Sequence, residues 1–578
     1  MRPEAKPVPS LDSDSIWLKI KRHKLVEWSL AYIAFGYATL HGVEMLRDAF
    51  QWPPIVPRLT VFALLLGFPV AVTLAWYHGH RARQRISGPE LLIVTLLLVV
   101  AGTILWNLGS GRKSVAVNVG PASAVGQRSI AVLPFLDLSQ THDQEYFADG
   151  MAEEILTLLA KIPELKVIGR TSSFQFKGKS QDLRQIGSAL GVAYVVEGSV
   201  SRSGNHIRVT AQLISTQDGA HRWAETFDRD ASDVFAMQDE IAQSLVRALD
   251  VEMNASAYLR RQHGSPNSES YDAYLRGLHA LDRADQRGFD EAEANFQRAL
   301  TIDPSFGPAA SALALAMEAA RVGGFVQPKE GFEQARAAAQ AALKLDPNSA
   351  VAHAVLCDLH VTYDWDWVDA EREARVATAL APNDPWVLFI AGRANLAVGR
   401  WEDARRLLDT AVALDPLSPA VAWVAGRVYQ RLGRQSDAEA SYRRVLDISP
   451  TYNYAHYWLG LTLLTEGKLD AAFSEMQRET LEVGRLAGLA LVYQAQRRTR
   501  EADSALASLQ AEYAGDAPLW IAEAYAFRGQ KDEAFLWLDR AYVQRDVGLY
   551  GIIGDPLLKN LEGDPRYALF LRKMKLTT

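Results

Sequence analysis

The chain has 578 residues, a net charge of −7 and a single cysteine, Cys357. At roughly 100–200 residues per domain, this length predicts about three or four domains. One cysteine excludes an intrachain disulfide and every zinc module that uses two or four cysteines. Residues 1–128 hold 14 Lys and Arg against 7 Asp and Glu, whereas the rest hold 47 against 61. The larger part is therefore acidic, which excludes the broad basic surface of a nucleic-acid binder, and we expect no nucleic-acid partner.

Apolar runs near the N-terminus predict a membrane anchor. Residues 59–77 and 91–106 contain no charged residue, histidine, asparagine or glutamine. A helix of about 20 residues crosses the ~30 Å hydrocarbon core of a bilayer, so both runs are candidates to span it. A third run at 28–46 is weaker because it contains His41 and Glu44. For that run, an amphipathic helix lying in the membrane interface is the alternative.

Basic residues predict the orientation of this anchor. Four of them precede the first run and three lie between the second and third runs, against four on the opposite side. Lysine and arginine are enriched on the cytoplasmic side of membrane helices. With three crossings, the N-terminus is then cytoplasmic and everything after about residue 109 lies outside the cytoplasm.

The next region reads as a small α/β domain after a glycine-rich linker at 109–128. An apolar run at 129–135 predicts a strand, and residues 145–162 place apolar side chains on one helical face. Alternating apolar and polar residues on both sides of Gly204 predict an antiparallel hairpin within 192–213. Shorter elements are expected at these places: a strand at 165–168, a helix at 181–190, a strand at 223–227 and a helix at 234–249.

Several motifs in this region resemble the TolB N-terminal-like module. They are IAVLPF at 130–135, YFADGMAEE at 146–154, VVEGS at 195–199, and Trp223 with the pair Phe227-Asp228. That module occurs with tetratricopeptide repeats in bacterial membrane proteins, so the resemblance implies an envelope-facing interaction module without known chemistry. Relatives often carry a winged-helix or a nucleotidyl cyclase domain upstream. We expect room for neither here, so we do not expect regulator or cyclase labels of relatives to apply.

Acidic residues cluster at the start of the predicted helix in this module: Asp143, Glu145, Asp149, Glu153 and Glu154. One interpretation is an acid/base or metal site. Acidic residues early in a helix more commonly favour the positive end of its dipole and face solvent. We therefore expect no catalytic residue, no metal and no cofactor.

The second half of the chain repeats at a fixed period. Prolines end small-residue helices at intervals of 43, 35, 34 and 34 residues. Alanine or valine recurs five residues before each proline and alanine twelve before, and glycines recur in the first helix and at the inter-helix turn. This pattern resembles the tetratricopeptide repeat, in which two antiparallel helices stack on their neighbours around a concave groove. The prolines are Pro304, Pro347, Pro382, Pro416 and Pro450.

The periodicity predicts about eight helix pairs. Together, the three regions predict a multi-domain fold class: a three-helix transmembrane anchor, a small TolB-like α/β domain and an all-α tetratricopeptide-repeat solenoid. The expected boundaries are a cytoplasmic basic tail at 1–27, transmembrane helices at 28–108, a linker at 109–128, the α/β domain at 129–250, a linker at 251–270, the solenoid at 271–545 and a C-terminal cap at 546–578.

First-helix positions that usually line the concave side of such repeats supply the candidate binding residues. Arg393 and Arg427 are 34 residues apart, so we expect them to stack side by side. Arginine binds carboxylates through two parallel hydrogen bonds, so the groove suits an extended peptide with an acidic side chain or a C-terminal carboxylate. The alternative is that these residues pack adjacent repeats or face water. The complete set is Trp386, Phe389, Arg393, Trp423, Arg427, Arg431, Tyr454 and Tyr457.

The sequence contains no nucleophile elbow, no zinc-protease helix motif and no dinucleotide glycine fingerprint. The interpretation is a non-enzymatic scaffold of the bacterial inner membrane, anchored in lipid, with its soluble domains in the periplasm and protein or peptide partners. One alternative is a membrane signal receiver that acts through a partner. A less favoured alternative is an enzyme related to nucleotidyl cyclases.

Overall fold

The computed structural model describes residues 128–140, 143–179, 181–250 and 267–576, together with a few positions between 32 and 64. It divides into two units, Met1–Ala122 and Ser123–Thr578. The predicted membrane runs lie almost entirely outside the described residues. Within the part that is described, no helix combines the length and apolar character that a bilayer crossing needs.

The second unit begins with a six-stranded mixed sheet in the order β3-β1-β4-β5-β6, with β2 paired to β4. Pro134 has no N–H for the strand ladder, and the strand expected at 129–135 is divided into β1 and β2. β1 runs parallel to β3 and β4, whereas β4, β5 and β6 are antiparallel, which confirms the predicted hairpin. The strands are β1 Ser129–Val132, β2 Leu136–Asp137, β3 Lys166–Val167, β4 Tyr194–Ser203, β5 His206–Ser215 and β6 His221–Asp230.

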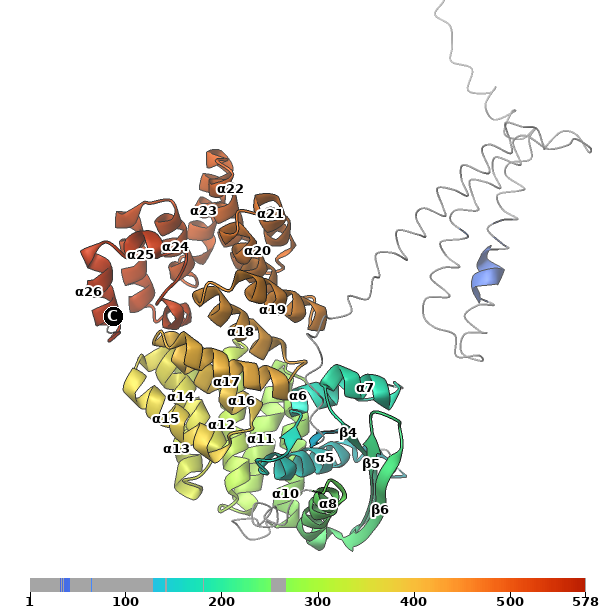
Figure 1. The fold of residues 1–578 in the computed structure, drawn as a ribbon. Helices are drawn as coiled ribbons and strands as arrows, with labels where there is room; N and C mark the ends of the chain where they lie inside the picture. Colours follow the sequence, from blue (N-terminus) through green and yellow to red (C-terminus); the bar gives the residue numbers. More distant parts are fainter. Residues whose placement is uncertain are drawn as a thin grey trace, which may run out of the picture. The chain divides into compact units, whose positions relative to one another are not determined.

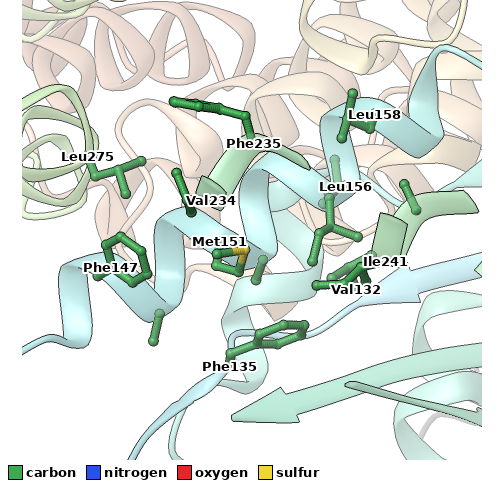
Figure 2. Close-up of a cluster of buried hydrophobic side chains, with 14 of the residues drawn as sticks. Val132, Phe135, Phe147, Met151, Leu156, Leu158, Val234, Phe235, Ile241 and Leu275 are labelled. Carbon is green, nitrogen blue, oxygen red and sulfur yellow. The ribbon is translucent and has the colours of Figure 1, made fainter. Parts of the chain in front are cut away.

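Helices cover both faces of this sheet. α5 (Glu145–Ala160) and α8 (Val234–Ala248) place Phe147, Met151 and Val234 in the main core of the domain, as Figure 2 shows. The opposite face is covered where α7 (Leu183–Leu190) packs on β1 and β4. A short helix, α6 (Arg170–Ser173), follows β3. We call residues 128–250 the module from here on.

The rest of the unit is a stack of antiparallel helix pairs, from α10 to α25 in Figure 1. Eight pairs are present between residues 268 and 543 of the described chain, which confirms the predicted number. They are α10 Ser268–Leu281 and α11 Gln286–Ile302, α12 Gly307–Val322 and α13 Pro328–Leu345, α14 Ala350–Leu359 and α15 Trp367–Leu380, α16 Pro385–Ala397 and α17 Trp401–Leu414, α18 Pro419–Arg431 and α19 Gln435–Ile448, α20 Ala455–Thr465 and α21 Leu469–Arg478, α22 Glu482–Ala495 and α23 Thr499–Tyr513, and α24 Pro518–Phe527 and α25 Lys531–Val543.

Small residues allow the two helices of a pair to approach closely. A Cβ atom built on Gly426 of α18 would come within 2.8 Å of the Tyr442 ring on α19. Gly399 and Gly433 lie at the inter-helix turns with φ of +78° and +72°, a conformation that glycine adopts without steric cost. The glycine positions predicted from the period are therefore confirmed.

The last part of the described chain, residues 544–576, is called the C-terminal segment. It contains the 3-10 turns η4 (Val547–Gly551) and η5 (Lys559–Leu561) and the helix α26 (Pro565–Lys573). The segment packs on α24 and α25, as expected for a cap, and it also returns to the middle of the solenoid. There the indole Nε1 of Trp367 donates to the carbonyl of Met574 at 2.7 Å.

Candidate binding groove

The predicted groove residues lie on α16, α18 and α20, the first helices of three consecutive pairs, except Tyr454, which directly precedes α20. A proline at the first helical position begins α16 and α18. Before α16, the Asp384 carboxylate also accepts the backbone N–H groups of Trp386 and Val387 at 2.8 and 3.1 Å. These start signals define where the helices begin, and the packing of their apolar faces determines which side chains point away from the core.

Arg393 has an internal carboxylate partner. Its guanidinium pairs with Asp358 on α14, a side chain with no exposed surface. Arg321 on α12 also donates to Asp358, at 3.0 Å, and pairs in turn with Glu318. Two arginines and two acidic residues therefore form a continuous buried chain across three neighbouring repeats.

Arg427, at the equivalent position of the next repeat, has aromatic neighbours instead. It donates to the Tyr550 hydroxyl of the C-terminal segment, and its guanidinium lies 4.9 Å from the ring centres of both Tyr550 and Trp458. The Nε atom of Arg427 is buried without a hydrogen-bond partner. Among the described residues, no carboxylate lies within ion-pair distance of this guanidinium.

Arg431, one helical turn further along α18, binds the same segment through a carboxylate. Its Nη2 atom donates to the Asp555 carboxylate and to the carbonyl of Gly551, both at 2.9 Å. The Arg431 side chain is 1% exposed. The C-terminal segment thus supplies an aromatic hydroxyl and an acidic side chain to two of the predicted arginines.

The predicted aromatic residues divide into buried and half-buried sets. Tyr457 is buried and stacks on Trp520 with ring centres 4.8 Å apart. Tyr454 meets the same Trp520 ring edge-on at 5.1 Å. Four predicted residues keep part of their surface exposed and form what we call the aromatic rim: Trp386, Phe389, Trp423 and Tyr454.

The C-terminal segment is an integral part of the fold. It buries eleven large apolar side chains. Seven of them, at roughly 1.5–3 kcal/mol each, already give a displacement cost on the order of 10–20 kcal/mol. A micromolar ligand supplies about 8 kcal/mol. The prediction of an external peptide at Arg393, Arg427, Arg431 and Tyr457 did not include these internal partners. The seven side chains are Leu549, Ile552, Leu558, Leu561, Tyr567, Phe570 and Leu571.

The residues that fill the groove were missed from the sequence. Tyr550 and Asp555 follow the last clear repeat and have no periodic neighbours that mark them. The sequence feature that could have indicated this close packing is the regular spacing of Gly548, Gly551 and Gly554. A Cβ atom at Gly554 would come within 2.6 Å of the Trp401 ring, so these glycines allow the segment to approach the helices closely.

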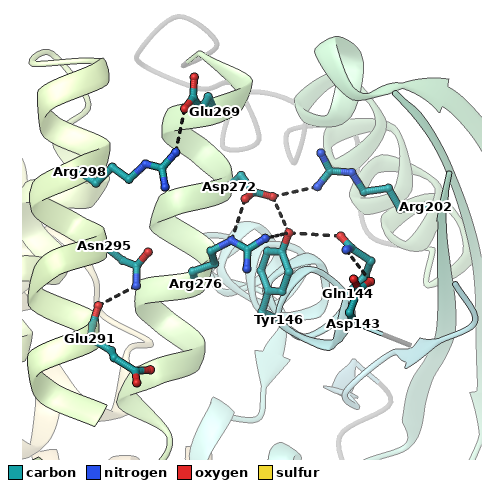
Figure 3. Close-up of polar contacts among 10 residues, drawn as sticks. All are labelled: Asp143, Gln144, Tyr146, Arg202, Glu269, Asp272, Arg276, Glu291, Asn295 and Arg298. Atoms are coloured by element: carbon teal, nitrogen blue, oxygen red, sulfur yellow. Dashed lines mark hydrogen bonds and ion pairs between the residues drawn. The ribbon is translucent and has the colours of Figure 1, made fainter. Parts of the chain in front are cut away.

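The second contact region of the solenoid is the module junction, where α5 packs on α10. A Cβ atom on Gly150 would come within 2.5 Å of Leu275, so this glycine allows the two helices to approach closely. Figure 3 shows the polar part. The Asp272 carboxylate accepts from the Tyr146 hydroxyl at 2.6 Å and from Arg202 and Arg276, each at 2.9 Å.

The acidic residues of α5 do not all face solvent, which corrects the expectation for them. Asp149 is 2% exposed and contacts Lys177 on the module and His279 on α10, at 2.5 and 3.2 Å. Glu153 binds Arg170 at 2.9 Å. Burial raises the pKa of Glu153, against the opposing effect of Arg170. The helix dipole is thus not the main partner of these groups.

A third set of contacts holds α6 against the ends of α17 and α18. The Asp415 carboxylate accepts the backbone N–H of Ser172 at 2.9 Å, and the backbone N–H of Gly169 donates to Leu414 at 2.7 Å. Asp415 belongs to the recurring Leu-Asp-Pro helix end. Burial raises the pKa of Asp415, partly offset by the hydrogen bonds from Ser172.

Cys357 is fully buried on α14. Burial raises the pKa of its thiol to about 12, so the thiolate that nucleophilic or redox chemistry needs is scarce at neutral pH.

Two regions of the chain match known families. Residues 391–453 match the family described as "Tetratricopeptide repeat", and residues 126–244 match "HilA/YgeH-like transcriptional regulator, second domain". Among curated proteins, "Putative adenylate cyclase 3" from Rhizobium meliloti (strain 1021) is 42% identical over 196 residues. The match covers 34% of this chain, and the chain spans about a third of that relative, 33% of its length.

Three solved structures show partial similarity to this chain. "Functional Characterization of Pseudomonas Aeruginosa pilF" is 23% identical, covers 37% of this chain and 96% of its own, and has a TM-score of 0.30. The type IV pilus biogenesis factor PilW is 20% identical, with coverages of 35% and 94% and a TM-score of 0.31. Human IFIT1 with m7Gppp-AAAA is 16% identical, with coverages of 54% and 85% and a TM-score of 0.37.

With TM-scores below 0.5, these likenesses carry no argument about binding or activity. The TolB resemblance of the module stays a prediction, because the matching family has a different description. The repeats are the part that sequence, fold and family comparison all support: the chain contains tetratricopeptide repeats.

Proposed function

We propose that the chain is a membrane-anchored scaffold that binds protein partners through its tetratricopeptide repeats and its TolB-like module. The observation that carries the proposal is the aromatic rim on the repeats. Tryptophan, tyrosine and phenylalanine are enriched in protein interfaces, because they bury much area at a small cost in side-chain entropy. Half-buried aromatics on consecutive repeats therefore suit a partner that runs along the stack.

The charge beneath the rim favours an acidic partner. Arg427 lies under Trp423 at 5.4 Å and has no carboxylate partner among the described residues. Arg427 therefore makes no direct ion pair of the kind that joins Arg393 to Asp358, although the buried carboxyl group of Glu523 lies close enough to interact with its charge. An extended peptide with an acidic side chain or a C-terminal carboxylate would be attracted to the rim without displacing the C-terminal segment.

The membrane part of the proposal is supported by the apolar runs and the distribution of basic residues. In the N-terminal unit, the Tyr32 hydroxyl donates to the carbonyl of Leu64 at 2.8 Å, so the first and second runs are in contact at this point. With three crossings, the proposed location is the bacterial inner membrane, with a cytoplasmic N-terminus, lipid around the runs and the soluble domains in the periplasm.

The test of partner binding is site-specific photo-crosslinking in cells. We expect a photoreactive residue in place of Trp386 or of Trp423 to capture protein partners. Capture from either position should be lost when the other of these two tryptophans is changed to alanine. A photoreactive residue at Leu536, which is 69% exposed on α25, is the matched control. Capture of the same proteins from Leu536 as from the rim would contradict the proposal.

The relative named as an adenylate cyclase calls for a direct comparison. We expect the purified full chain to convert no ATP to cyclic AMP, because the matched region is only a third of that relative. Turnover by the wild-type chain would replace the scaffold proposal with an enzymatic one.

A further inference from the structure

We infer that Asp149, His279 and Asp282 form a binding site for a divalent transition metal of the zinc type at the module junction. The inference is independent of the proposed function. Asp149 lies on α5 of the module and His279 lies on α10. Asp282 directly follows the last residue of α10. An ion bound here would join the module to the first repeat.

The geometry places one ligand atom from each residue within 4.8 Å of the other two. The His279 Nδ1 atom is already 3.2 Å from an Asp149 carboxylate oxygen. Nitrogen and oxygen ligands about 2.0–2.2 Å from a tetrahedral zinc ion are roughly 3.3–3.6 Å from each other. The three ligand atoms are thus close enough to meet on one ion once Asp282 moves away from Arg170, which holds both of its carboxylate oxygens at 2.6 Å.

A buried oxygen without a partner points to a missing ligand. Asp149 is 2% exposed, and its Oδ1 atom has no hydrogen-bond partner. Lys177 and His279 both contact the other oxygen, Oδ2. An unsatisfied buried acceptor costs free energy, and a metal ion on Oδ1 would remove that cost.

The local charge leaves room for a divalent cation. Two cations stand at the junction: Lys177 contacts Asp149 and Glu145, and Arg170 contacts Glu153 and Asp282. Glu154, whose Oε1 atom accepts from the Tyr274 hydroxyl at 3.3 Å, adds a further negative charge. Five carboxylates thus face two fixed cations and a histidine. The excess is negative, and Lys177 and Arg170 compete with a metal for Asp149 and Asp282.

The donor set selects the class of metal. Calcium and magnesium prefer all-oxygen sites, whereas an imidazole nitrogen with two carboxylates suits zinc, manganese or cobalt. Three protein ligands leave a coordination position for water. Because two separate parts of the chain supply the ligands, the expected consequence of binding is a tighter junction.

The experiment uses the full-length chain, freed of metal with a chelator. We expect calorimetric titration with ZnCl2 to show one site, and Co2+ to give a visible absorption band that Zn2+ abolishes. His279→Gln should weaken Zn2+ binding at least tenfold, because the ring nitrogen is lost from a side chain that is 36% exposed. Asp149→Asn should weaken it as well.

Two further variants make the result specific. His353→Gln removes a histidine that contacts a single carboxylate, Glu373, on α15, so it should leave Zn2+ binding unchanged. Lys177→Met removes the competing cation and should tighten Zn2+ binding. The inference is overturned if the wild-type chain binds no Zn2+ or Co2+, if His279→Gln binds as tightly as the wild type, or if Lys177→Met weakens binding.

Discussion

Two regions of the solenoid are covered by other parts of the same chain, and different interactions hold them. At the module junction, the ion pairs of Asp272 with Arg202 and Arg276 are part-exposed and lie beside an apolar contact, where Leu275 joins the core of the module. At the C-terminal segment, Arg431 and Asp555 are 1% and 6% exposed and lie among apolar side chains. The two contacts thus differ in their polar parts: the ion pairs of the first are part-exposed at the edge of an apolar core, whereas the ion pair of the second is buried.

The difference teaches how each contact responds to change. Exposed charges are screened by salt and contribute little singly, whereas a buried pair is screened weakly and leaves a costly charge when one partner is removed. The C-terminal contact should therefore be sensitive to single substitutions and insensitive to salt. The ion pairs at the module junction should be more sensitive to salt and less sensitive to the loss of a single charge.

The largest effect is expected from Asp555→Ala. It leaves the Arg431 guanidinium buried without its carboxylate, at a cost of about 3–5 kcal/mol in the free energy of unfolding. Urea unfolding of the full chain measures this loss. As a control, Asp532→Ala removes an exposed partner of Arg566 and should cost less than about 1 kcal/mol. Equal losses for the two variants would erase the distinction between the contacts.

A smaller effect is expected from Gly150→Ala at the module junction. The added methyl group would meet Leu275 at 2.5 Å, and overpacking of this kind costs about 1–3 kcal/mol. Gly515→Ala is the control, because a Cβ atom there meets nothing within 4 Å. Thermal unfolding should show a loss for Gly150→Ala alone. A change of similar size in both variants would point to an effect of glycine on the unfolded chain.

Salt distinguishes the two contacts more finely. Asp272→Asn removes one carboxylate that binds Arg202 and Arg276, and we expect a loss of roughly 1 kcal/mol at low salt. Screening should shrink that loss in about 1 M NaCl, where the Debye length is near 3 Å. The loss in Asp555→Ala should stay nearly constant. If both losses shrink alike, the C-terminal contact is more hydrated than its burial indicates.

The parts of the fold that could be predicted from the sequence are those with local, repeated causes. Helix pairs follow from the spacing of prolines, turns follow from Gly399 and Gly433, and the hairpin follows from alternating residues around Gly204. Each of these signals acts within one element or between neighbours. The eight helix pairs could thus be counted before any coordinates.

The parts that could not be predicted depend on contacts between distant residues. Arg427 and Tyr550 are 123 residues apart, and Tyr146 and Asp272 are 126 apart. A first-helix position that usually lines a groove does not reveal what lies in the groove. The spacing placed Arg393 and Arg427 at equivalent sites, but only the fold shows that Asp358 pairs with one and Tyr550 with the other.

The smallest effect concerns a pair outside both contacts, His353 on α14 and Glu373 on α15, 2.5 Å apart. The hydrogen bond to Glu373 raises the pKa of His353. A histidine whose pKa is raised on folding stabilises the fold fully below its unfolded value, near 6.5, and loses that contribution as pH rises through the folded value. His353→Gln should therefore cost up to about 1 kcal/mol at pH 5.5 and less at pH 8.5. Urea unfolding at the two pH values measures the difference. Because this pair belongs to neither contact, an equal cost at both pH values would assign any pH dependence of the wild type to other groups.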